Sequence, residues 1–201
     1  MTHRAQPQTT LDRRHAVVVL LDGRDDVLVV PGLGSATWDC AAAGDNPLRF
    51  SLWGAMGNAS MIGLGLALAQ PARRVLVLTG DGDMLMGLAS LATIATQAPP
   101  NLALVVLDNE RHGETGMQPT HTAHRTDLAA AAAACGFAET RQVADEAGLR
   151  AALPLVHEVP GPTFLTVKVH AEPLPRVLPP RDGAYLKDRF RAALLGPDAV
   201  L

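Results

Sequence analysis

Aromatic residues and cysteines are scarce in this sequence, and positive charge is not in excess. Phe, Trp and Tyr make up 3% of the 201 residues, so the core has to be built from aliphatic side chains. The two cysteines, Cys40 and Cys135, are too few for a disulfide framework and indicate a reducing cytoplasm. Acidic residues outnumber basic ones by 20 to 17, which excludes the broad basic surface typical of nucleic-acid-binding proteins.

Long hydrophobic runs are also rare, and one stretch approaches the length of a membrane span. Residues 52–69 carry no charge over eighteen positions. Four glycines, Asn58 and Ser60 interrupt the stretch, so a glycine-rich loop leading into a buried helix explains it better. The polar N-terminus lacks the apolar segment of a signal peptide. With 48% hydrophobic and 18% charged residues, we expect one folded domain with no membrane or nucleic-acid partner.

Short apolar runs alternate with helix-like segments along the chain. The runs have no polar face, which is typical of parallel strands covered on both sides. The pattern predicts an α/β fold, a three-layer sandwich whose central parallel sheet is flanked by helices. Strands are expected at Val27–Val30, Arg49–Trp53, Val75–Thr79, Leu102–Leu107, Glu139–Val143 and Thr163–Val169. Helices are expected at Ser35–Ala43 with Ser35 as N-cap, and at Gly57–Gln70, Met84–Thr96, Asp127–Cys135 and Asp145–Leu153.

Two regions do not follow this alternation. His15–Leu21 suits a strand because it contains three consecutive valines, and it suits a helix by the spacing of its apolar residues. The tail from Lys168 to Arg191 carries six bases against three acids and ends in an expected helix, Ala184–Leu195. This tail is either a solvated arm or a strap across a partner.

The sequence Gly80-Asp81-Gly82 directly follows the apolar run Val75–Thr79. In a parallel sheet this junction lies at the carboxyl edge, where doubly wound folds bind ligands. Glycines let the backbone approach an anion closely, and the N–H groups of a new helix favour phosphate. Asp81, expected at an exposed strand end, can bind a divalent cation that neutralises phosphate oxygens. The motif therefore predicts a phosphorylated ligand together with a metal ion.

A second polar segment, Asp108-Asn109-Glu110-Arg111, follows the next apolar run, Leu102–Leu107. The 26 residues from 83 to 108 are enough for one helix, one turn and one strand, so the two runs are expected to be neighbours in the sheet. Asp81 and Asn109 can then reach the same ion, with a backbone carbonyl after Asn109 as a further oxygen ligand.

Three other interpretations of these segments fit less well. Asp81 could simply cap the following helix, although Asn109 at the matching strand end favours a metal. A calcium-binding loop starting at Asp81 would place Leu85 and Ala92 at ligand positions. A dinucleotide-binding fingerprint over residues 32–37 lacks its third small residue and the later acidic residue.

Taken in order, the motifs resemble those of the thiamine diphosphate-dependent enzymes, whose cofactor-binding domain carries Gly-Asp-Gly and, one strand later, Asn. The segment Leu52-Trp53-Gly54-Ala55-Met56-Gly57 is similar to the family's upstream motif. The resemblance implies a thiamine diphosphate-binding domain over residues 16–201, in which 172–201 form a C-terminal arm. Residues 1–15 are expected to be a loose N-terminal segment.

The resemblance also implies roles for matching residues. Mg²⁺ would be held by Asp81, Asn109 and the carbonyl of Arg111. The cofactor would be lined by Gly80, Gly82 and Asp83 at its diphosphate, and the loop of Gly32, Gly34 and Ser35 would lie near the same cofactor. The Gly54 carbonyl would accept a hydrogen bond from the aminopyrimidine, and Met56 would support the bent cofactor. For Met56 an ordinary core position is the alternative.

The segment from Leu107 to Gln118 is most similar to the phosphonopyruvate and sulfopyruvate decarboxylases within that family. His112, Glu114 and Gln118 are candidate catalytic residues that would close over the substrate and handle protons. His112, His121 and His124 could alternatively bind zinc, although they lack cysteine ligands and helical spacing.

Two departures from the family pattern bear on function. The family's activating glutamate belongs to a separate pyrimidine-binding domain, so a partner subunit is expected to supply it. Asp83 stands where relatives have a small neutral residue, and its carboxylate would repel the diphosphate unless the side chain turns away or caps the helix.

The sequence therefore predicts the thiamine diphosphate- and Mg²⁺-binding subunit of a cytoplasmic, hetero-oligomeric 2-oxoacid decarboxylase. A 3-sulfo- or 3-phosphonopyruvate-like acid is the expected substrate, by resemblance. The alternatives are a subunit of an acetolactate-type carboligase and a non-catalytic cofactor-binding subunit.

Overall fold

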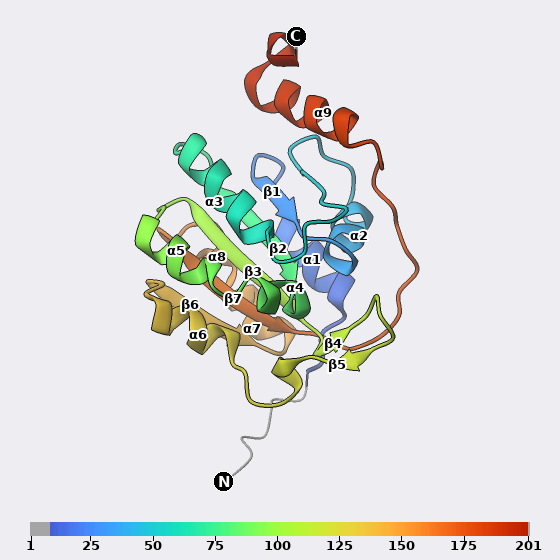
Figure 1. Cartoon of the computed structure of the whole chain (residues 1–201), viewed down its shortest axis with the longest axis vertical. Helices are drawn as coiled ribbons and strands as arrows, with labels where there is room; N and C mark the ends of the chain where they lie inside the picture. The colour runs from blue at the N-terminus through green and yellow to red at the C-terminus, as the bar shows by residue number, and fades with distance from the viewer. Residues whose placement is uncertain (1–8, 201) are drawn as a thin grey trace.

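A five-stranded sheet, in which every strand is parallel to its neighbours, forms the centre of the molecule (Figure 1). The computed structural model describes residues 9–200. The strand order is β1-β2-β3-β7-β6, from β1 (Leu28–Pro31), β2 (Val75–Gly80), β3 (Leu102–Asp108), β6 (Glu139–Val143) and β7 (Thr163–Lys168). The parallel sheet predicted from the alternating pattern is confirmed.

Helices cover both faces of the sheet, which confirms the three-layer sandwich. Alternate strand residues point to opposite faces: Leu76 and Leu78 join one buried cluster, and Val75 and Val77 join the other. The first cluster is completed by α1 (Arg13–Leu21), α2 (Ser35–Ala42), α7 (Glu146–Ala151) and α8 (Leu153–His157). The second is completed by α3 (Ala59–Ala69), α4 (Asp81–Met86), α5 (Ser90–Gln97), α6 (Leu128–Cys135) and α9 (Gly183–Leu195).

The expected strand over Arg49–Trp53 is not a regular strand. Arg49 forms an isolated parallel bridge with Val29. Backbone hydrogen bonds run from Phe50 N to Val29 O (2.8 Å) and from Leu52 N to Pro31 O (3.1 Å). The segment therefore lies extended along the edge of β1, and its hydrogen bonds stop where the chain turns into the loop before α3.

Two expected helices are each broken in two. The helix predicted over Met84–Thr96 divides at Gly87 into α4 and α5, because Gly87 lies directly against the backbone of Gly57. A Cβ at Gly87 would overlap the Gly57 carbonyl oxygen. The helix predicted over Asp145–Leu153 ends at Ala151, and α8 starts afresh with proline in its first turn.

The ambiguous segment His15–Leu21 is helical. Asp12 caps α1 by accepting a hydrogen bond from His15 N (2.6 Å), and Val18 is the valine that faces solvent. Packing of α1 against α2 and α7 outweighs the local strand preference of the valines. For α2 the expected cap is wrong, since Gly34 is the N-cap and Ser35 is the first helical residue.

The two ends of the chain differ in how they meet this core. Thr9 Oγ1 donates a hydrogen bond to Lys168 O (2.7 Å), and α1 begins at Arg13; the rest of the expected loose segment, residues 1–8, lies outside the described residues. After β7 the chain has no regular structure until α9, and it runs along the outside of the molecule (Figure 1). The last turn, η2, spans Pro197–Val200.

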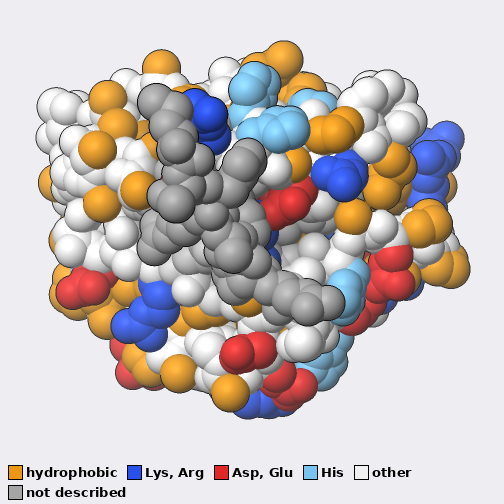
Figure 2. Space-filling view, turned by 90° about the horizontal axis from the view of Figure 1, so that it is seen from below, with side chains coloured by type: hydrophobic (Ala, Val, Ile, Leu, Met, Phe, Trp, Pro, Cys, Tyr) orange, Lys and Arg blue, Asp and Glu red, His pale blue; other side chains and the backbone are white. Residues whose placement is uncertain are grey.

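Among residues 9–200, no helix is long and apolar enough to cross a membrane. Figure 2 shows basic side chains in small groups, interspersed with acidic ones and histidines, on the face it views.

Candidate active site

Asp81 and Asn109 stand at the ends of two adjacent parallel strands. Gly80 is paired with Leu107 in the register of β2 and β3, Asp81 begins α4, and Asn109 follows Asp108 at the end of β3. Both side chains therefore leave the sheet at its carboxyl edge, where doubly wound folds bind ligands.

Asp81 is buried, with 2% of its surface exposed, whereas the sequence led us to expect an exposed strand end. Its Oδ2 atom accepts a hydrogen bond from Thr120 Oγ1 (2.5 Å), and Thr122 Oγ1 lies at 3.2 Å. Burial, followed by the negative charge of Asp108, raises the pKa of Asp81 from 3.8 to about 6. A divalent cation beside the Asp81 carboxylate would offset both the burial and the repulsion from Asp108. Carboxylate oxygens are ligands that suit Mg²⁺.

Asp108 is neutralised from the neighbouring strand by a buried lysine. Lys168 Nζ lies 3.0 Å from Asp108 Oδ2 and 2.5 Å from Glu110 Oε1, and the lysine side chain is 4% exposed. Two side chains of the same loop accept hydrogen bonds from backbone N–H groups: Glu110 N donates to Asp108 Oδ1, and Arg111 N donates to Asn109 Oδ1, both at 3.0 Å. The loop that carries Asn109 and the Arg111 carbonyl is thus held by the Lys168 ion pairs and by its own hydrogen bonds.

The carboxylate of Asp83 points into the protein. Gly57 N and Thr79 Oγ1 each donate a hydrogen bond to it at 2.5 Å, and a Cβ at Gly32 would overlap its Oδ2 atom. One buried side chain therefore connects the loop after β1, the end of β2 and the Met56–Gly57 segment. Of the orientations that the sequence allowed for Asp83, the side chain adopts the one that turns its charge inward, where these donors take it up.

Gly82, His112 and Met56 lie together. A Cβ added at Gly82 would be 2.7 Å from His112 Nδ1 and 3.8 Å from Met56 Cε. Met56 is half-buried and does not belong to either core cluster, and Gly54, two residues before it, is exposed. Residues from three separate sequence motifs thus meet at one place.

The candidate catalytic residues lie on a short hairpin, β4 (Arg111–His112) and β5 (Gln118–Pro119). Glu114 lies against the loop after β1, because a Cβ at Gly34 would be 3.4 Å from its Cγ. Gln118 is tied into the hairpin: its Nε2 donates to Thr115 O (2.8 Å) and its Oε1 accepts from Thr115 Oγ1 (2.7 Å). The structure thus brings His112 and Glu114 to the glycine loops and holds Gln118 within the hairpin.

The zinc alternative has no geometric support. His121 and His124 are exposed, at and just after the turn η1 (His121–Ala123). Within residues 9–200 no three His, Cys, Asp or Glu side chains are grouped closely enough to hold a metal ion. Asn109 and a backbone carbonyl are not of these types, so this finding does not bear on the Mg²⁺ candidates.

Sequence reasoning missed three contributors to the site: Thr120, Thr122 and Lys168. The two threonines look like ordinary loop residues, and no local signal marks them. Lys168 gives a usable signal, because a lysine within an apolar strand with covered faces must find a partner.

The C-terminal arm contacts the same edge through both tryptophans of the chain. Arg176 lies 4.6 Å above the ring of Trp38 in α2, and Arg181 lies 5.5 Å above the ring of Trp53. Trp53 Nε1 also donates a hydrogen bond to Pro180 O (2.8 Å). The arm is thus fastened next to the Gly34 loop and next to Gly54.

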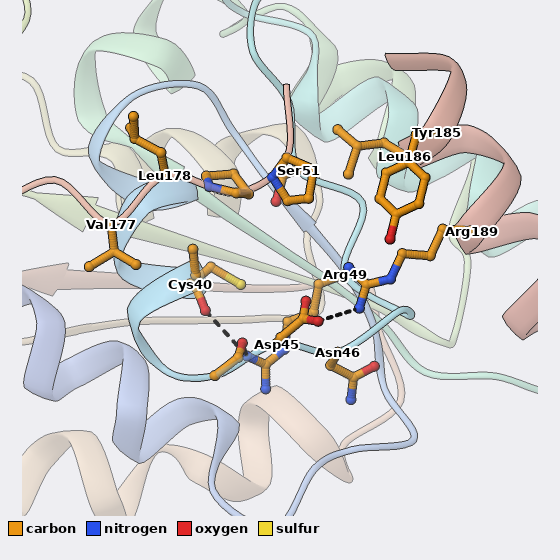
Figure 3. A pocket seen from close by; sticks show the side chains of 14 residues that line it. Cys40, Asp45, Asn46, Arg49, Ser51, Val177, Leu178, Tyr185, Leu186 and Arg189 are labelled. Atoms are coloured by element: carbon orange, nitrogen blue, oxygen red, sulfur yellow. Dashed lines mark hydrogen bonds and ion pairs between the residues drawn. The ribbon is translucent and has the colours of Figure 1, made fainter. Parts of the chain in front are cut away.

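A cavity of about 210 Å³ lies under the base of this arm (Figure 3). Its walls come from the end of α2, the segment up to Ser51, the arm and α9, and it includes the ion pair between Asp45 and Arg189 at 2.8 Å. No residue of the Gly-Asp-Gly or Asn109 segments lines it. It is therefore separate from the candidate active site.

Comparison with known proteins agrees with this arrangement. Residues 35–167 match the family described as thiamine pyrophosphate enzyme, C-terminal TPP binding domain, and the chain belongs to that family. The sulfopyruvate decarboxylase subunit beta of Methanothermobacter thermautotrophicus is 42% identical over 159 residues, which are 79% of this chain and 82% of that protein. The phosphonopyruvate decarboxylase of Streptomyces viridochromogenes is 38% identical over 179 residues, 87% of this chain and 44% of that protein.

A solved structure shares the fold at low sequence identity. The thiamine diphosphate-dependent 4-hydroxybenzoylformate decarboxylase of Rhodococcus jostii RHA1 superposes with a TM-score of 0.68 at 21% identity. The match covers 86% of this chain and 35% of that one. The family and the fold expected from the motifs are confirmed.

Proposed function

We propose that this chain is the thiamine diphosphate- and Mg²⁺-binding subunit of a two-subunit enzyme that decarboxylates a 2-oxoacid with a negatively charged group on C3. The observation that carries the proposal is the meeting of Asp81, Asn109, Gly82, Met56 and His112 at the carboxyl edge of β2 and β3. The names of the two curated relatives support a sulfonate or phosphonate as that charged group.

Mg²⁺ would be held by the Asp81 carboxylate, the Asn109 amide oxygen and the Arg111 carbonyl. Asn109 Oδ1 accepts one hydrogen bond, from Arg111 N, and keeps a second lone pair for the ion. Thr120 and Thr122 orient Asp81, while Lys168 neutralises Asp108 and so limits repulsion between the two carboxylates.

Thiamine diphosphate, when bound, supplies the electron sink for the loss of CO₂. Gly80 would leave room for its diphosphate, because nothing lies within 4 Å of a Cβ placed there, and Gly82 would border the diphosphate beside His112. The loop of Gly32, Gly34 and Ser35 would lie near the cofactor, and Met56 would support its bent shape. The Gly54 carbonyl would accept a hydrogen bond from its aminopyrimidine. The Asp83 side chain does not face the diphosphate in this proposal, and it instead holds the Gly57 backbone in place.

The hairpin supplies the residues proposed to exchange protons with the substrate. His112 lies over Gly82 and Glu114 lies over Gly34, so both can exchange a proton with a substrate held above the glycine loops. Gln118 stabilises the hairpin through Thr115.

The activating glutamate is proposed to come from a partner subunit with a pyrimidine-binding domain. In support, a relative that this chain matches over 82% of its length is itself named a subunit.

Cys40 and Cys135 are both free thiols, in keeping with the proposed cytoplasmic location.

The experiment compares the purified chain alone with the chain plus the product of the neighbouring gene. Each sample receives thiamine diphosphate, Mg²⁺ and one of several 2-oxoacids, and CO₂ release is followed. We expect the chain alone to be silent and the complex to act on 3-sulfo- or 3-phosphonopyruvate. A condensation product would instead identify a carboligase, and cofactor binding without turnover of any acid would identify a non-catalytic subunit.

A further inference from the structure

The two arginines that fasten the C-terminal arm differ in how their charge is balanced. Arg176 Nη2 lies 3.6 Å from Glu114 Oε2, so the charge of Arg176 is partly neutralised by this carboxylate of the hairpin. For Arg181 no carboxylate lies within ion-pair distance in the described part of the chain, and its guanidinium instead stacks on the ring of Trp53. Arg181 is therefore an exposed cation whose hydrogen-bond donors remain available.

The position of Arg181 is fixed from both sides. Its predecessor Pro180 accepts the hydrogen bond from Trp53 Nε1. Its successor Asp182 caps α9 by accepting from Ala184 N (2.9 Å) and Tyr185 N (3.1 Å). An arginine held between two anchored neighbours loses less conformational entropy when it binds a ligand than one on a free loop.

The helix that follows is itself anchored to the body. Phe190 of α9 is buried, and its ring lies 5.5 Å from that of Phe50. Arg189 pairs with Asp45 across the cavity seen in Figure 3. The arm is thus attached through the middle of α9 as well as at Trp53, so the setting of Arg181 does not depend on one contact.

Arg181 also stacks on the segment that leads into the candidate active site. Trp53, under its guanidinium, directly precedes Gly54, and Met56 of the same segment approaches Gly82. The arm delivers a planar cation to the segment that borders the proposed cofactor. A guanidinium matches the oxygens of a sulfonate or phosphonate with two parallel hydrogen bonds, and stacking on an aromatic ring keeps it planar and oriented.

We propose that Arg181 binds the negatively charged group on C3 of the substrate and so determines that the enzyme prefers a dianionic 2-oxoacid. This inference rests on the proposed function. Arg181 would then be the residue of this chain that contacts the charged group of the substrate. It lies on an arm outside residues 35–167, the part of the chain that matches the family. Sulfonate and phosphonate share the relevant chemistry, a tetrahedral group with several anionic oxygens.

The test uses the full chain in complex with its partner subunit, loaded with thiamine diphosphate and Mg²⁺. KM and kcat are measured for 3-sulfopyruvate, 3-phosphonopyruvate and 2-oxobutanoate, whose tail is uncharged. Arg181→Met should raise KM for the charged acids roughly 10- to 100-fold and leave 2-oxobutanoate within about twofold, because only the charged tails lose a hydrogen-bonded ion pair. Arg181→Lys should fall between these values, since it keeps the charge and loses the planar fork.

Arg73→Met is the matched control. It makes the same change at a partly exposed arginine that precedes β2, at the opposite edge of the sheet, where Arg73 Nη2 donates a hydrogen bond to Asp26 O (2.6 Å). It should leave every KM unchanged. Melting curves of the two Arg181 variants should coincide with that of the wild type, because Arg181 is exposed.

A binding measurement tests the same role of Arg181 independently of turnover. Calorimetric titration of the same loaded complex with 3-sulfopropanoate and 3-phosphonopropanoate, which lack the keto group, should give a Kd that rises roughly 10- to 100-fold in Arg181→Met. Propanoate is the uncharged-tail reference. A wild-type complex that binds these dianions through Arg181 without releasing CO₂ from any 2-oxoacid would refute the decarboxylase proposal alone. If Arg181→Met binds and decarboxylates the charged acids as the wild type does, the role of Arg181 is refuted.

Discussion

Replacing Lys168 by methionine should destabilise the protein strongly, although the change makes the side chain more apolar. Lys168 is buried at the end of β7, where its ammonium group bridges Asp108 and Glu110. Methionine fills much the same volume without charge, so Asp108, itself 2% exposed, is left as a buried carboxylate without its cation.

The size of the loss follows from what remains around the carboxylates. Breaking a buried ion pair by removing one partner costs about 3–5 kcal/mol. Asp108 Oδ1 keeps hydrogen bonds from Thr122 Oγ1 (2.8 Å) and Glu110 N (3.0 Å), and Glu110 is partly exposed and can turn to water. We therefore expect a loss near the lower end, about 3 kcal/mol, which is a large share of the 5–15 kcal/mol typical of a domain.

Urea unfolding at neutral pH, followed by circular dichroism, measures this loss. Lys187→Met is the control, because Lys187 is exposed and pairs with Asp188 at the surface, where the change should cost less than about 1 kcal/mol. The double variant Lys168→Met with Asp108→Asn removes the stranded charge and should regain more than half of the lost stability. A single variant within about 1 kcal/mol of the wild type, or a double variant no more stable than the single one, would refute the reasoning.

Four further predictions concern individual residues. Asp81→Asn keeps the buried shape and removes the charge, so calorimetry should show Mg²⁺-dependent thiamine diphosphate binding weakened at least 10-fold with little change in melting temperature; wild-type affinity would contradict the metal assignment. Met56→Ala should reduce the activity of the assembled enzyme far more than its stability, since Met56 lies outside the core; a stability loss of about 2–5 kcal/mol with normal kinetics would mark it as a core residue instead. Gly87→Ala should lower the midpoint of urea unfolding by an equivalent of about 1–3 kcal/mol, because its methyl group would overlap the Gly57 carbonyl, and an unchanged midpoint would exclude that close approach. Burial lowers the pKa of His157 from 6.5 to about 4, so the unfolded chain binds the proton at a higher pH than the folded one. The contribution of neutral His157 to stability is therefore full above about pH 6.5 and is lost as the pH falls towards 4. Urea unfolding measured across this range should show a smaller dependence of the free energy of unfolding on pH in His157→Gln, and an unchanged dependence would contradict the prediction.

Much of the fold could be predicted because its signals are local. Apolar runs without a polar face identify β2, β3 and β7 as buried parallel strands, and the structure has them within a residue of the predicted bounds. Asp127 and Asp145 mark helix starts because their carboxylates accept hydrogen bonds from backbone N–H groups three residues ahead, at 2.9 and 2.7 Å.

Where a distant neighbour outweighs local preference, the sequence left the structure open or predicted it wrongly. The valines of α1 favour a strand by themselves and form a helix because α2 and α7 cover them. Gly87 ends α4 because Gly57, thirty positions earlier, occupies the space beside it. No window of sequence around either site contains the residues that decide the outcome.

The candidate site divides in the same way. Sequence order alone placed Asp81 and Asn109 at neighbouring strand ends, because parallel strands joined by one helix bring their carboxyl ends together. The direction of the Asp83 carboxylate, the Lys168 bridge and the stacking of Arg181 on Trp53 were decided only by tertiary structure. Each joins residues far apart in the chain, and the energy of such a pair depends on distance, burial and shared donors, which exist only after the chain has folded.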